Sequence, residues 1–260
     1  MHALADWVVP ELVGVFTDID DTLTTEGAIT PDALQALVDL KAAGLHVVPI
    51  TGRPVGWSEP FAQSWPVDAI VAENGAVALV HTDSQPLRKI YQQDAATRAT
   101  HFARMQQVLA RIERELPQAQ RARDSAGRET DIAIDHSEFA RLPPPAIDAV
   151  VRLMQAEGMT ATVSSIHING WFGTHDKLAG ARWIVRELWG RSLDAELQRW
   201  VYVGDSTNDQ VMFGHFMHSV GVANIRRFAD RLTHPPRHIT QGERGAGFAE
   251  LARHVLRSHA

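Results

Sequence analysis

The chain has 260 residues, of which 45% are hydrophobic and 22% are charged, and its formal net charge is −6. This composition is typical of a folded protein with a sizeable core, and it excludes disorder as the default interpretation. The negative net charge and the absence of a basic run argue against binding of nucleic acid or of an anionic membrane. The chain has no cysteine, which excludes disulfides and thiolate metal sites.

The first residues, MHALADWVVPELVG, combine neither a basic start nor a continuous apolar stretch with a small-residue cleavage site. No segment approaches the roughly 18 consecutive apolar residues of a membrane helix. We therefore expect a cytoplasmic protein that does not span a membrane. We also expect it to be a monomer or a homodimer.

The first part of the chain alternates short apolar runs with helical patterns. Apolar runs at residues 12–17, 45–50 and 67–72 predict buried strands. Residues 30–44 predict a helix, because Thr30 and Pro31 are typical of its start and a glycine stands at its end. Continuous apolar strands that alternate with helices indicate a parallel sheet covered on both faces.

The middle of the chain has a different pattern. Residues 94–116 are polar with one apolar stripe, and they predict a long helix. Residues 130–136 and 160–170 alternate apolar and polar side chains, as half-exposed antiparallel strands do, and residues 143–158 between them predict another helix. This segment is therefore expected to form an inserted α+β unit.

From residue 176 on, the first pattern returns. Residues 176–190 predict a helix, residues 199–204 a strand, and residues 205–216 the start of another helix. The predicted fold is α/β, with a Rossmann-like parallel sheet core formed by residues 1–82 and 172–260. An inserted α+β unit at residues 83–171 is expected to interrupt this core.

Polar clusters follow the predicted strands, at the sheet edge where ligands bind in parallel α/β folds. These clusters are DIDDT at 18–22, TGR at 51–53, ENG at 73–75 and GDSTND at 204–209. Their carboxylates are hard oxygen ligands of the kind that Mg²⁺ prefers, and a threonine, a glycine amide and Lys177 offer donors to a phosphate. Acids, a cation and phosphate donors at one edge indicate phosphoryl transfer.

In this order, DIDDT (DxDxT), TGR, the lysine of HDKLAG and GDSTND resemble the four motifs of the haloacid dehalogenase (HAD) superfamily. The AENGA stretch and the large insert between the second and third motifs are similar to its phosphatase branch with a second-position cap. That branch includes sugar-phosphate phosphatases and Cof-like hydrolases. The resemblance implies Mg²⁺-dependent hydrolysis of a small phosphorylated metabolite, with a sugar phosphate as the expected substrate.

The resemblance also implies a role for each matched residue. Asp18 is the expected nucleophile, which forms an aspartyl-phosphate, and Asp20 the expected general acid and then base. The expected ligands of Mg²⁺ are the carboxylates of Asp18 and Asp205 and the main-chain carbonyl of Asp20. The residues expected around that metal site are Asn208 and Asp209. The phosphoryl group is expected to be held by Thr51, Gly52 and Lys177.

Two alternatives stay open beside the hydrolase. A phosphomutase or phosphotransferase of the same fold uses the same carboxylate pair. A phospho-accepting regulatory module also combines acids, a threonine and a lysine at sheet ends. Asp20 argues against an ATPase-type enzyme, whose relatives carry threonine at this position. Asp21 is expected to stabilise a turn and not to be catalytic.

Substrate specificity is expected to come from the insert, because a cap that closes over the site excludes water and contacts the leaving group. The residues expected to contact the substrate are His167 and Asn169, which lead directly into the core, and Arg53 and Asn74. For Arg53 the alternative is a carboxylate partner, and for Asn74 it is a turn between two strands. Further polar candidates in the insert are Arg123, Arg128, Ser164 and Ser165.

Overall fold

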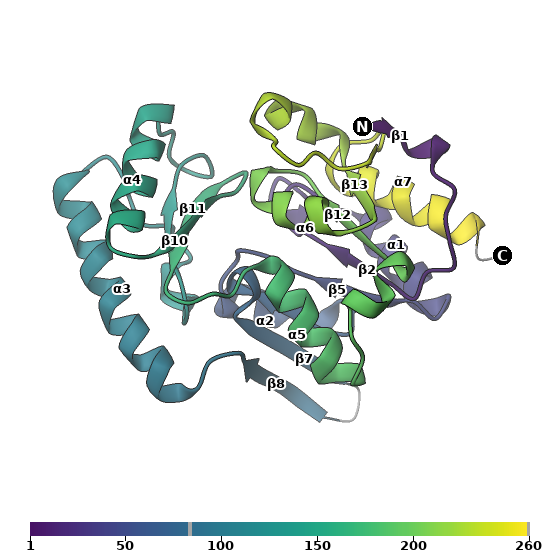
Figure 1. Cartoon of the computed structure of the whole chain (residues 1–260), viewed down its shortest axis with the longest axis horizontal. Coiled ribbons are helices and arrows are strands. Elements are labelled where there is room, and N and C mark those ends of the chain that lie inside the picture. The colour runs from purple at the N-terminus through teal and green to yellow at the C-terminus, as the bar shows by residue number, and fades with distance from the viewer. Residues whose placement is uncertain (83–84, 259–260) are drawn as a thin grey trace.

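The computed structural model describes residues 1–82 and 85–258 and contains a six-stranded sheet in the order β1-β14-β13-β12-β2-β5 (Figure 1). Every neighbouring pair in this sheet is parallel. Its strands are β1 (His2–Ala3), β2 (Gly14–Thr17), β5 (His46–Pro49), β12 (Trp200–Gly204), β13 (His218–Gly221) and β14 (His238–Ile239). The predicted parallel α/β core is confirmed, and the carboxyl ends of these strands share one edge.

Helices cover both faces of this sheet, because successive strand residues point to opposite sides. Val15 packs in a core with helices α1 (Pro31–Ala42), α2 (Val55–Ser64) and α7 (Arg244–Arg257). Its neighbour Phe16 packs in a second core with helices α5 (Lys177–Trp189) and α6 (Gln210–His215). The sheet therefore lies between two apolar layers, and its polar carboxyl edge is left for a site.

An antiparallel sheet adjoins the end of β5. It consists of β6 (Ile70–Ala72), β7 (Val77–Thr82) and β8 (Gln85–Tyr91), and Val71 bridges to Ile50. Glu73 and Asn74 form the turn between β6 and β7 with φ angles of 48° and 55°. A small hairpin, β3 (Thr24–Thr25) and β4 (Ala28–Ile29), follows the first acidic motif.

A second layered unit, on the left of Figure 1, carries the middle of the chain. Helices α3 (Ala95–Glu115) and α4 (Pro144–Ala156) pack on an antiparallel sheet in the order β10-β11-β9. Its strands are β9 (Ile132–Asp135), β10 (Thr160–Val163) and β11 (His167–Trp171). The predicted α+β architecture of this segment is present, and the name cap is used below for residues 95–171.

The expectation of half-exposed strands is wrong for β9 and β11, which are buried along their whole length. One face of the cap sheet packs on α3 and α4, and polar residues of the other face contact the parallel-sheet unit. Asn169, for example, is 1% exposed and donates to the carbonyl of Gly52. The alternation of these strands therefore reflects a buried polar interface instead of a solvent-exposed face.

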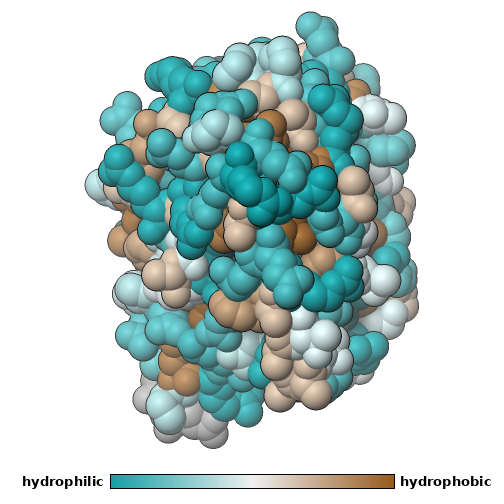
Figure 2. All heavy atoms as spheres, turned by 90° about the vertical axis from the view of Figure 1, so that its left-hand side faces the viewer, coloured by the Kyte–Doolittle hydropathy of each residue, from teal (hydrophilic) through white to brown (hydrophobic). Residues whose placement is uncertain are grey.

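The predicted domain division at residues 1–82, 83–171 and 172–260 stays a prediction, and its first boundary adjoins residues 83–84, which lie outside the described residues. Strand β8 pairs with β7 beside the parallel sheet, and α3 begins after it. Figure 2 shows the outward side of the cap, where hydrophilic side chains predominate and hydrophobic ones are scattered. Within the described part of the chain, no helix is both long and apolar enough to cross a membrane.

Candidate active site

Three carboxylates and one lysine converge at the carboxyl edge of the parallel sheet. Asp18 follows β2, Asp205 follows β12, and Asp209 lies one turn further along. One oxygen atom of each carboxylate lies within 4.8 Å of the other two. Lys177, the first residue of α5, places Nζ 2.6 Å from Asp18 Oδ1 and 2.7 Å from Asp209 Oδ1. The sequence prediction that these segments meet is confirmed by their geometry.

The charges of this cluster are not balanced. Burial raises the pKa of Asp18 to about 7, although Lys177 lowers this pKa. The neighbouring carboxylates of Asp209 and Asp20 also raise it. Burial together with Asp18 and Asp209 also raises the pKa of Asp205. One buried lysine therefore faces several carboxylates, and this excess of negative charge would be relieved by a cation.

The donor set fits a hard divalent cation such as Mg²⁺. Oδ1 of Asp205 is buried and has no hydrogen-bond partner among the described residues, although Oδ2 accepts from Asn224 Nδ2 at 3.1 Å. A buried carboxylate oxygen without a partner is costly unless a ligand binds it. One oxygen atom of Asp18 and one of Asp205 lie within 4.8 Å of each other, close enough to bind one ion.

Both carboxylate oxygens of Asp209 accept hydrogen bonds, which hold the loop of residues 204–209 in place. Its Oδ1 accepts from Lys177 and from the hydroxyl of Tyr202, and its Oδ2 accepts from the main-chain N–H groups of Asp205 and Ser206 at 3.0 and 3.1 Å. Ser206 in turn donates to Asn208 Oδ1 at 2.7 Å. Asp209 thus belongs to the cluster and Asn208 lies beside it, and their predicted role around a metal ion stays a prediction.

Asp20 lies beside the cluster with its carboxylate turned to Arg53. Arg53 Nε donates to both oxygens at 3.0 and 2.9 Å, and Nη2 donates to Oδ1 at 2.9 Å. The same guanidinium reaches Glu138 at 2.8 Å and Asp124 at 3.2 Å, both in the cap. Arg53 is 5% exposed, so its charge is shared among three carboxylates, which agrees with the carboxylate-partner interpretation of this residue.

Residues 51–53, named here the phosphate loop, connect β5 to α2. The Thr51 hydroxyl accepts the N–H of Arg53 at 3.0 Å, and its carbonyl accepts the N–H of Asn74 at 2.9 Å. The Asn74 side chain donates to Asp131 of the cap at 3.3 Å, and its main chain forms the predicted turn. The loop is thus fixed in position beside Asp18.

The hairpin formed by β10 and β11 of the cap lies over the cluster. An inner cavity of about 10 Å³ lies between Asp18, Gly52 and Asn208 on one side and Ser164, His167 and Asn169 on the other. His167 Nε2 lies 2.8 Å from Glu138 Oε2. Burial opposes ionisation of Glu138, but hydrogen bonds from His167 and Arg53 outweigh it and lower the pKa of Glu138 to about 2. Space for a ligand at the cluster is therefore small and enclosed.

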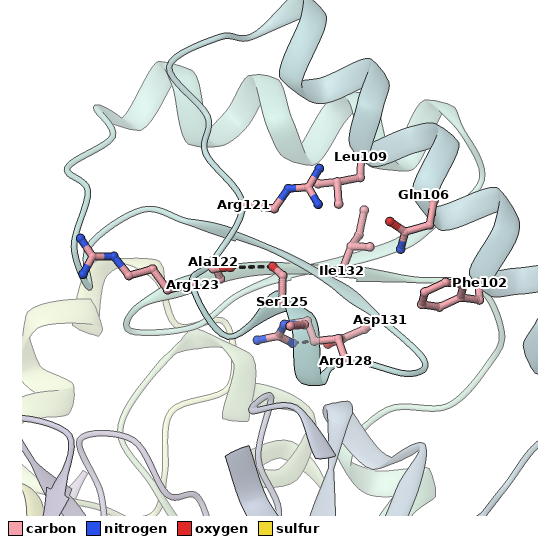
Figure 3. A pocket seen from close by; sticks show the side chains of 11 residues that line it. Phe102, Gln106, Leu109, Arg121, Ala122, Arg123, Ser125, Arg128, Asp131 and Ile132 are labelled. Carbon is pink, nitrogen blue, oxygen red and sulfur yellow. Dashed lines mark hydrogen bonds and ion pairs between the residues drawn. The ribbon is translucent and has the colours of Figure 1, made fainter. Parts of the chain in front are cut away.

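A larger cavity of about 590 Å³ opens outside Asp20. It is lined by residues of both units, among them Asp20, Asp21, Arg53, Glu138, Arg141 and Ile166. Another cavity, of about 580 Å³, lies inside the cap between α3 and residues 121–132 (Figure 3). Its described lining holds no residue of the four motifs, so only the first of these two cavities adjoins the acidic cluster.

Asp21 has the structural role predicted for it. Its φ angle is 56°, its carbonyl accepts from Asn224 Nδ2 at 3.0 Å, and its carboxylate lies 3.0 Å from Arg244 Nε. Asn224 is a residue that the sequence analysis missed, although it follows strand β13 as the recognised motifs follow theirs. Tyr202 was missed as well, because its apolar ring fits the strand pattern and only its hydroxyl reaches the site.

The sequence analysis also missed the carboxylates that join the two units. Glu73 is fully buried, and it accepts the N–H of Val55, the N–H groups of Glu129 and Thr130, and the Thr130 hydroxyl. Its neighbour Asp131 binds Arg128 Nη1 at 2.7 Å and Asn169 Nδ2 at 2.9 Å. These contacts depend on how the cap sits on the core, and no local sequence signal identifies them.

One family model and many solved structures are similar to this chain. Residues 15–115 match the family model of the haloacid dehalogenase-like hydrolases, a segment that includes DIDDT, TGR and ENG. No curated protein sequence matches the chain. A search of solved structures, in contrast, gives many matches over nearly the whole chain.

Three of these structures illustrate the likeness. Thermoplasma acidophilum 0175 has 15% identity and a TM-score of 0.70, with 94% of this chain and 99% of that chain covered. A candidate HAD/COF-like hydrolase from Plasmodium vivax has 16% identity and a TM-score of 0.69, with 95% and 96% covered. The sucrose-phosphatase of Synechocystis sp. PCC6803, solved with sucrose and phosphate, has 15% identity and a TM-score of 0.66, with 94% and 98% covered. At these identities the likeness shows a common fold.

Proposed function

We propose that the chain is a Mg²⁺-dependent phosphatase of the haloacid dehalogenase superfamily, because residues 15–115 match the model of that family and the chain shares its fold with a candidate HAD/COF-like hydrolase. Its substrate is a phosphomonoester of a small metabolite, and a sugar phosphate is the proposed class. The observation that carries this proposal is the buried convergence of Asp18, Asp205 and Lys177 beneath a closed cap. The cytoplasm is the proposed location.

Asp18 is the proposed nucleophile. It follows β2, its N–H is fixed by the carbonyl of Val203 at 2.9 Å, and one of its oxygens accepts from Lys177. The carboxylate attacks phosphorus and displaces the leaving-group oxygen, which gives an aspartyl-phosphate that water then hydrolyses. Asp18, Asp205 and the main-chain carbonyl of Asp20 would hold Mg²⁺, which would supply neutralising positive charge during phosphoryl transfer.

Asp20 is the proposed general acid and base. Its carboxylate accepts hydrogen bonds from Arg53 and lines the cavity of about 590 Å³, and as a base it would take a proton from the attacking water. To protonate the leaving group it has to carry a proton and therefore to loosen its contact with Arg53. Glu138 and Asp124 make this loosening feasible, because they remain partners of the guanidinium when Asp20 leaves.

The phosphoryl group is proposed to lie between Asp18 and the phosphate loop. The Thr51 hydroxyl, the Gly52 amide and Lys177 are its proposed donors, and Lys177 also keeps Asp18 and Asp209 from repelling each other. His167 and Asn169 enclose the same space from the cap, and Asn74 is proposed to support it from the turn, where its side chain donates to Asp131 of the cap. The enclosure separates this region from bulk solvent, which strengthens each electrostatic contact to the phosphoryl oxygens.

The leaving group is proposed to occupy the cavity of about 590 Å³ outside Asp20. This volume suits a ligand of sugar size. Support for a sugar phosphate comes from the shared fold with the sucrose-phosphatase. Nucleic acid and membranes are not proposed as partners, since the chain has a net charge of −6.

A phosphate-release assay tests this function. The purified protein is incubated with Mg²⁺ and a panel of phosphorylated sugars, nucleotides and phosphoglycerates, and with the same panel in the presence of a chelator. We expect phosphate release from at least one sugar phosphate, and loss of that release with the chelator. Transfer of the phosphoryl group to another position of the substrate, without release of free phosphate, would contradict the hydrolase and support a phosphomutase.

A further inference from the structure

The carbonyl of Gly52, in the middle of the phosphate loop, is held by two side chains of the cap. Arg128 Nη1 donates to it at 3.0 Å and Asn169 Nδ2 donates to it at 3.2 Å. These residues stand 76 and 117 positions away in the sequence. The cap therefore contacts the main chain of the loop and does not merely cover it.

One carboxylate of the cap orients both donors. Asp131 Oδ1 accepts from Arg128 at 2.7 Å, and Oδ2 accepts from Asn169 at 2.9 Å. Arg128 also pairs with Asp124 at 3.1 Å. Figure 3 shows Arg128 and Asp131 turned toward each other at the side of the cap cavity that faces the core. With exposed fractions of 5%, 1% and 1% for Arg128, Asp131 and Asn169, water does not compete for these bonds.

The remainder of the loop is held by the core. The N–H of Asn74 donates to the carbonyl of Thr51 at 2.9 Å, and the N–H of Glu73 donates to the carbonyl of Arg53 at 3.0 Å. These two bonds come from a turn in the left-handed region, which is costly for residues other than glycine and persists where surrounding contacts hold it. Gly52 thus lies between two carbonyls held by the core, and its own carbonyl is held by the cap.

Arg128 is placed to fix geometry and not to contact the substrate. Its guanidinium donates to two aspartates and to a main-chain carbonyl. Its charge is thus balanced inside the cap. The Gly52 carbonyl shares its peptide plane with the N–H of Arg53, which donates to the Thr51 hydroxyl at 3.0 Å. Holding this carbonyl therefore also orients the Thr51 hydroxyl, which is one of the proposed donors to the phosphoryl group.

We propose that Arg128, together with Asp131 and Asn169, is a positioning residue that gives the phosphate loop its binding conformation from the cap. Affinity for the phosphoryl group is then complete only while the cap is docked on the core. By linkage, a phosphate bound at the loop stabilises the docked cap to the same extent. The inference rests on the proposed function in one respect, that residues 51–53 bind the phosphoryl group.

Hydrogen exchange of the loop tests the proposal without any substrate. The variant is Arg128→Met, which keeps an unbranched side chain in place of the arginine stem and removes its donors. The matched control is Arg121→Met, because Arg121 lines the same cap cavity but pairs with Glu113 on the surface. We expect the amides of a peptide spanning residues 50–54 to exchange about fivefold faster or more in Arg128→Met and at the wild-type rate in Arg121→Met.

Binding of inorganic phosphate with Mg²⁺ is the second readout. We expect its dissociation constant to rise by about tenfold in Arg128→Met, to recover in part in Arg128→Lys, and to stay unchanged in the control. A purely structural role would lower the melting temperature while leaving phosphate affinity per folded molecule and loop exchange unchanged. That result would overturn the proposal.

Asn169→Ala carries the same test if Arg128→Met does not fold, since it removes one donor to Gly52 and leaves the ion pair of Arg128 with Asp131. Faster exchange of residues 50–54 in this variant supports the proposal, and wild-type exchange contradicts it. The outcome is separable from the proposed function. A wild-type protein that releases no phosphate from any ester refutes the function, whereas unchanged loop exchange in the variants refutes the positioning role.

Discussion

Lys177 Nζ lies 2.6 Å from Asp18 Oδ1, although 159 positions separate the two residues. Both are almost fully buried, and Lys177 also binds Asp209 at 2.7 Å. Burial lowers the pKa of a lysine, but these two carboxylates outweigh burial and raise the pKa of Lys177 above its usual value. The lysine therefore carries its charge at neutral pH, where it offsets the negative charge of the two carboxylates.

Lys177→Met is expected to destabilise the protein by about 3 kcal/mol, because it leaves two buried carboxylates without their cation. Urea unfolding at neutral pH measures this loss. Lys41→Met is the control, since Lys41 pairs with Asp68 at 31% exposure and its removal should cost about 0.5 kcal/mol. Added Mg²⁺ should restore part of the stability of Lys177→Met. Equal losses in the two variants would contradict the role assigned to Lys177.

Glu73→Gln tests the buried carboxylate that joins the turn of residues 73–75 to the cap. The two side chains have the same shape, but the amide group of glutamine would face N–H and O–H donors from Val55, Glu129 and Thr130. Unpaired buried donors cost about 2 kcal/mol in total. Thermal unfolding should show this loss for Glu73→Gln and almost none for Glu11→Gln, whose side chain is 83% exposed. A stable Glu73→Gln protein would argue against the contact.

Glu138→Gln tests the sharing of Arg53 between the core and the cap. It removes one negative charge from the guanidinium, so the hold of Arg53 on Asp20 should become stronger and release of Asp20 harder. We expect kcat to fall about tenfold with a smaller change in KM. Steady-state kinetics on the best substrate of the panel would show it. A rise in KM alone would instead indicate that Glu138 contacts the substrate.

His175 gives a prediction for pH. Burial, with a smaller contribution from His101, lowers the pKa of His175 from 6.5 to about 4. Between these values the unfolded chain binds a proton that the folded protein does not, so stability falls as the pH falls from 6.5 to 4. The full difference amounts to about 3 kcal/mol.

His175→Phe should remove this part of the acid sensitivity, which is measured as the free energy of unfolding at pH 7 and pH 4.5. His234→Phe is the control, because His234 is exposed and should leave the slope unchanged. If wild type and His175→Phe lose stability in parallel, His175 is not the group that titrates.

The parallel core and its motif residues could be predicted from the sequence because each signal is local. Asp18, Thr51 and Asp205 each follow an apolar strand. Parallel pairing of these strands brings their carboxyl ends, and with them the three residues, to one edge of the sheet. Lys177 followed from its position at the start of a helix. Asn224 had the same signal after β13 and could have been found by it.

The contacts between core and cap could not be predicted in this way. Whether Glu138 meets Arg53, or Arg128 meets Gly52, depends on the angle at which the cap sits on the core, which no periodicity encodes. The alternating pattern of β9 and β11 correctly indicated strands. It gave the wrong environment, because a buried polar interface and a solvent-exposed face produce the same alternation.

The central claim is that Asp18 carries the phosphoryl group. Its most direct test is phosphate release by wild type and by Asp18→Asn, measured side by side with Mg²⁺ and the best substrate of the panel, after circular dichroism has shown that both are folded. We predict that release by Asp18→Asn falls by roughly three orders of magnitude or more. Release by Asp18→Asn at a rate close to that of wild type would contradict the account.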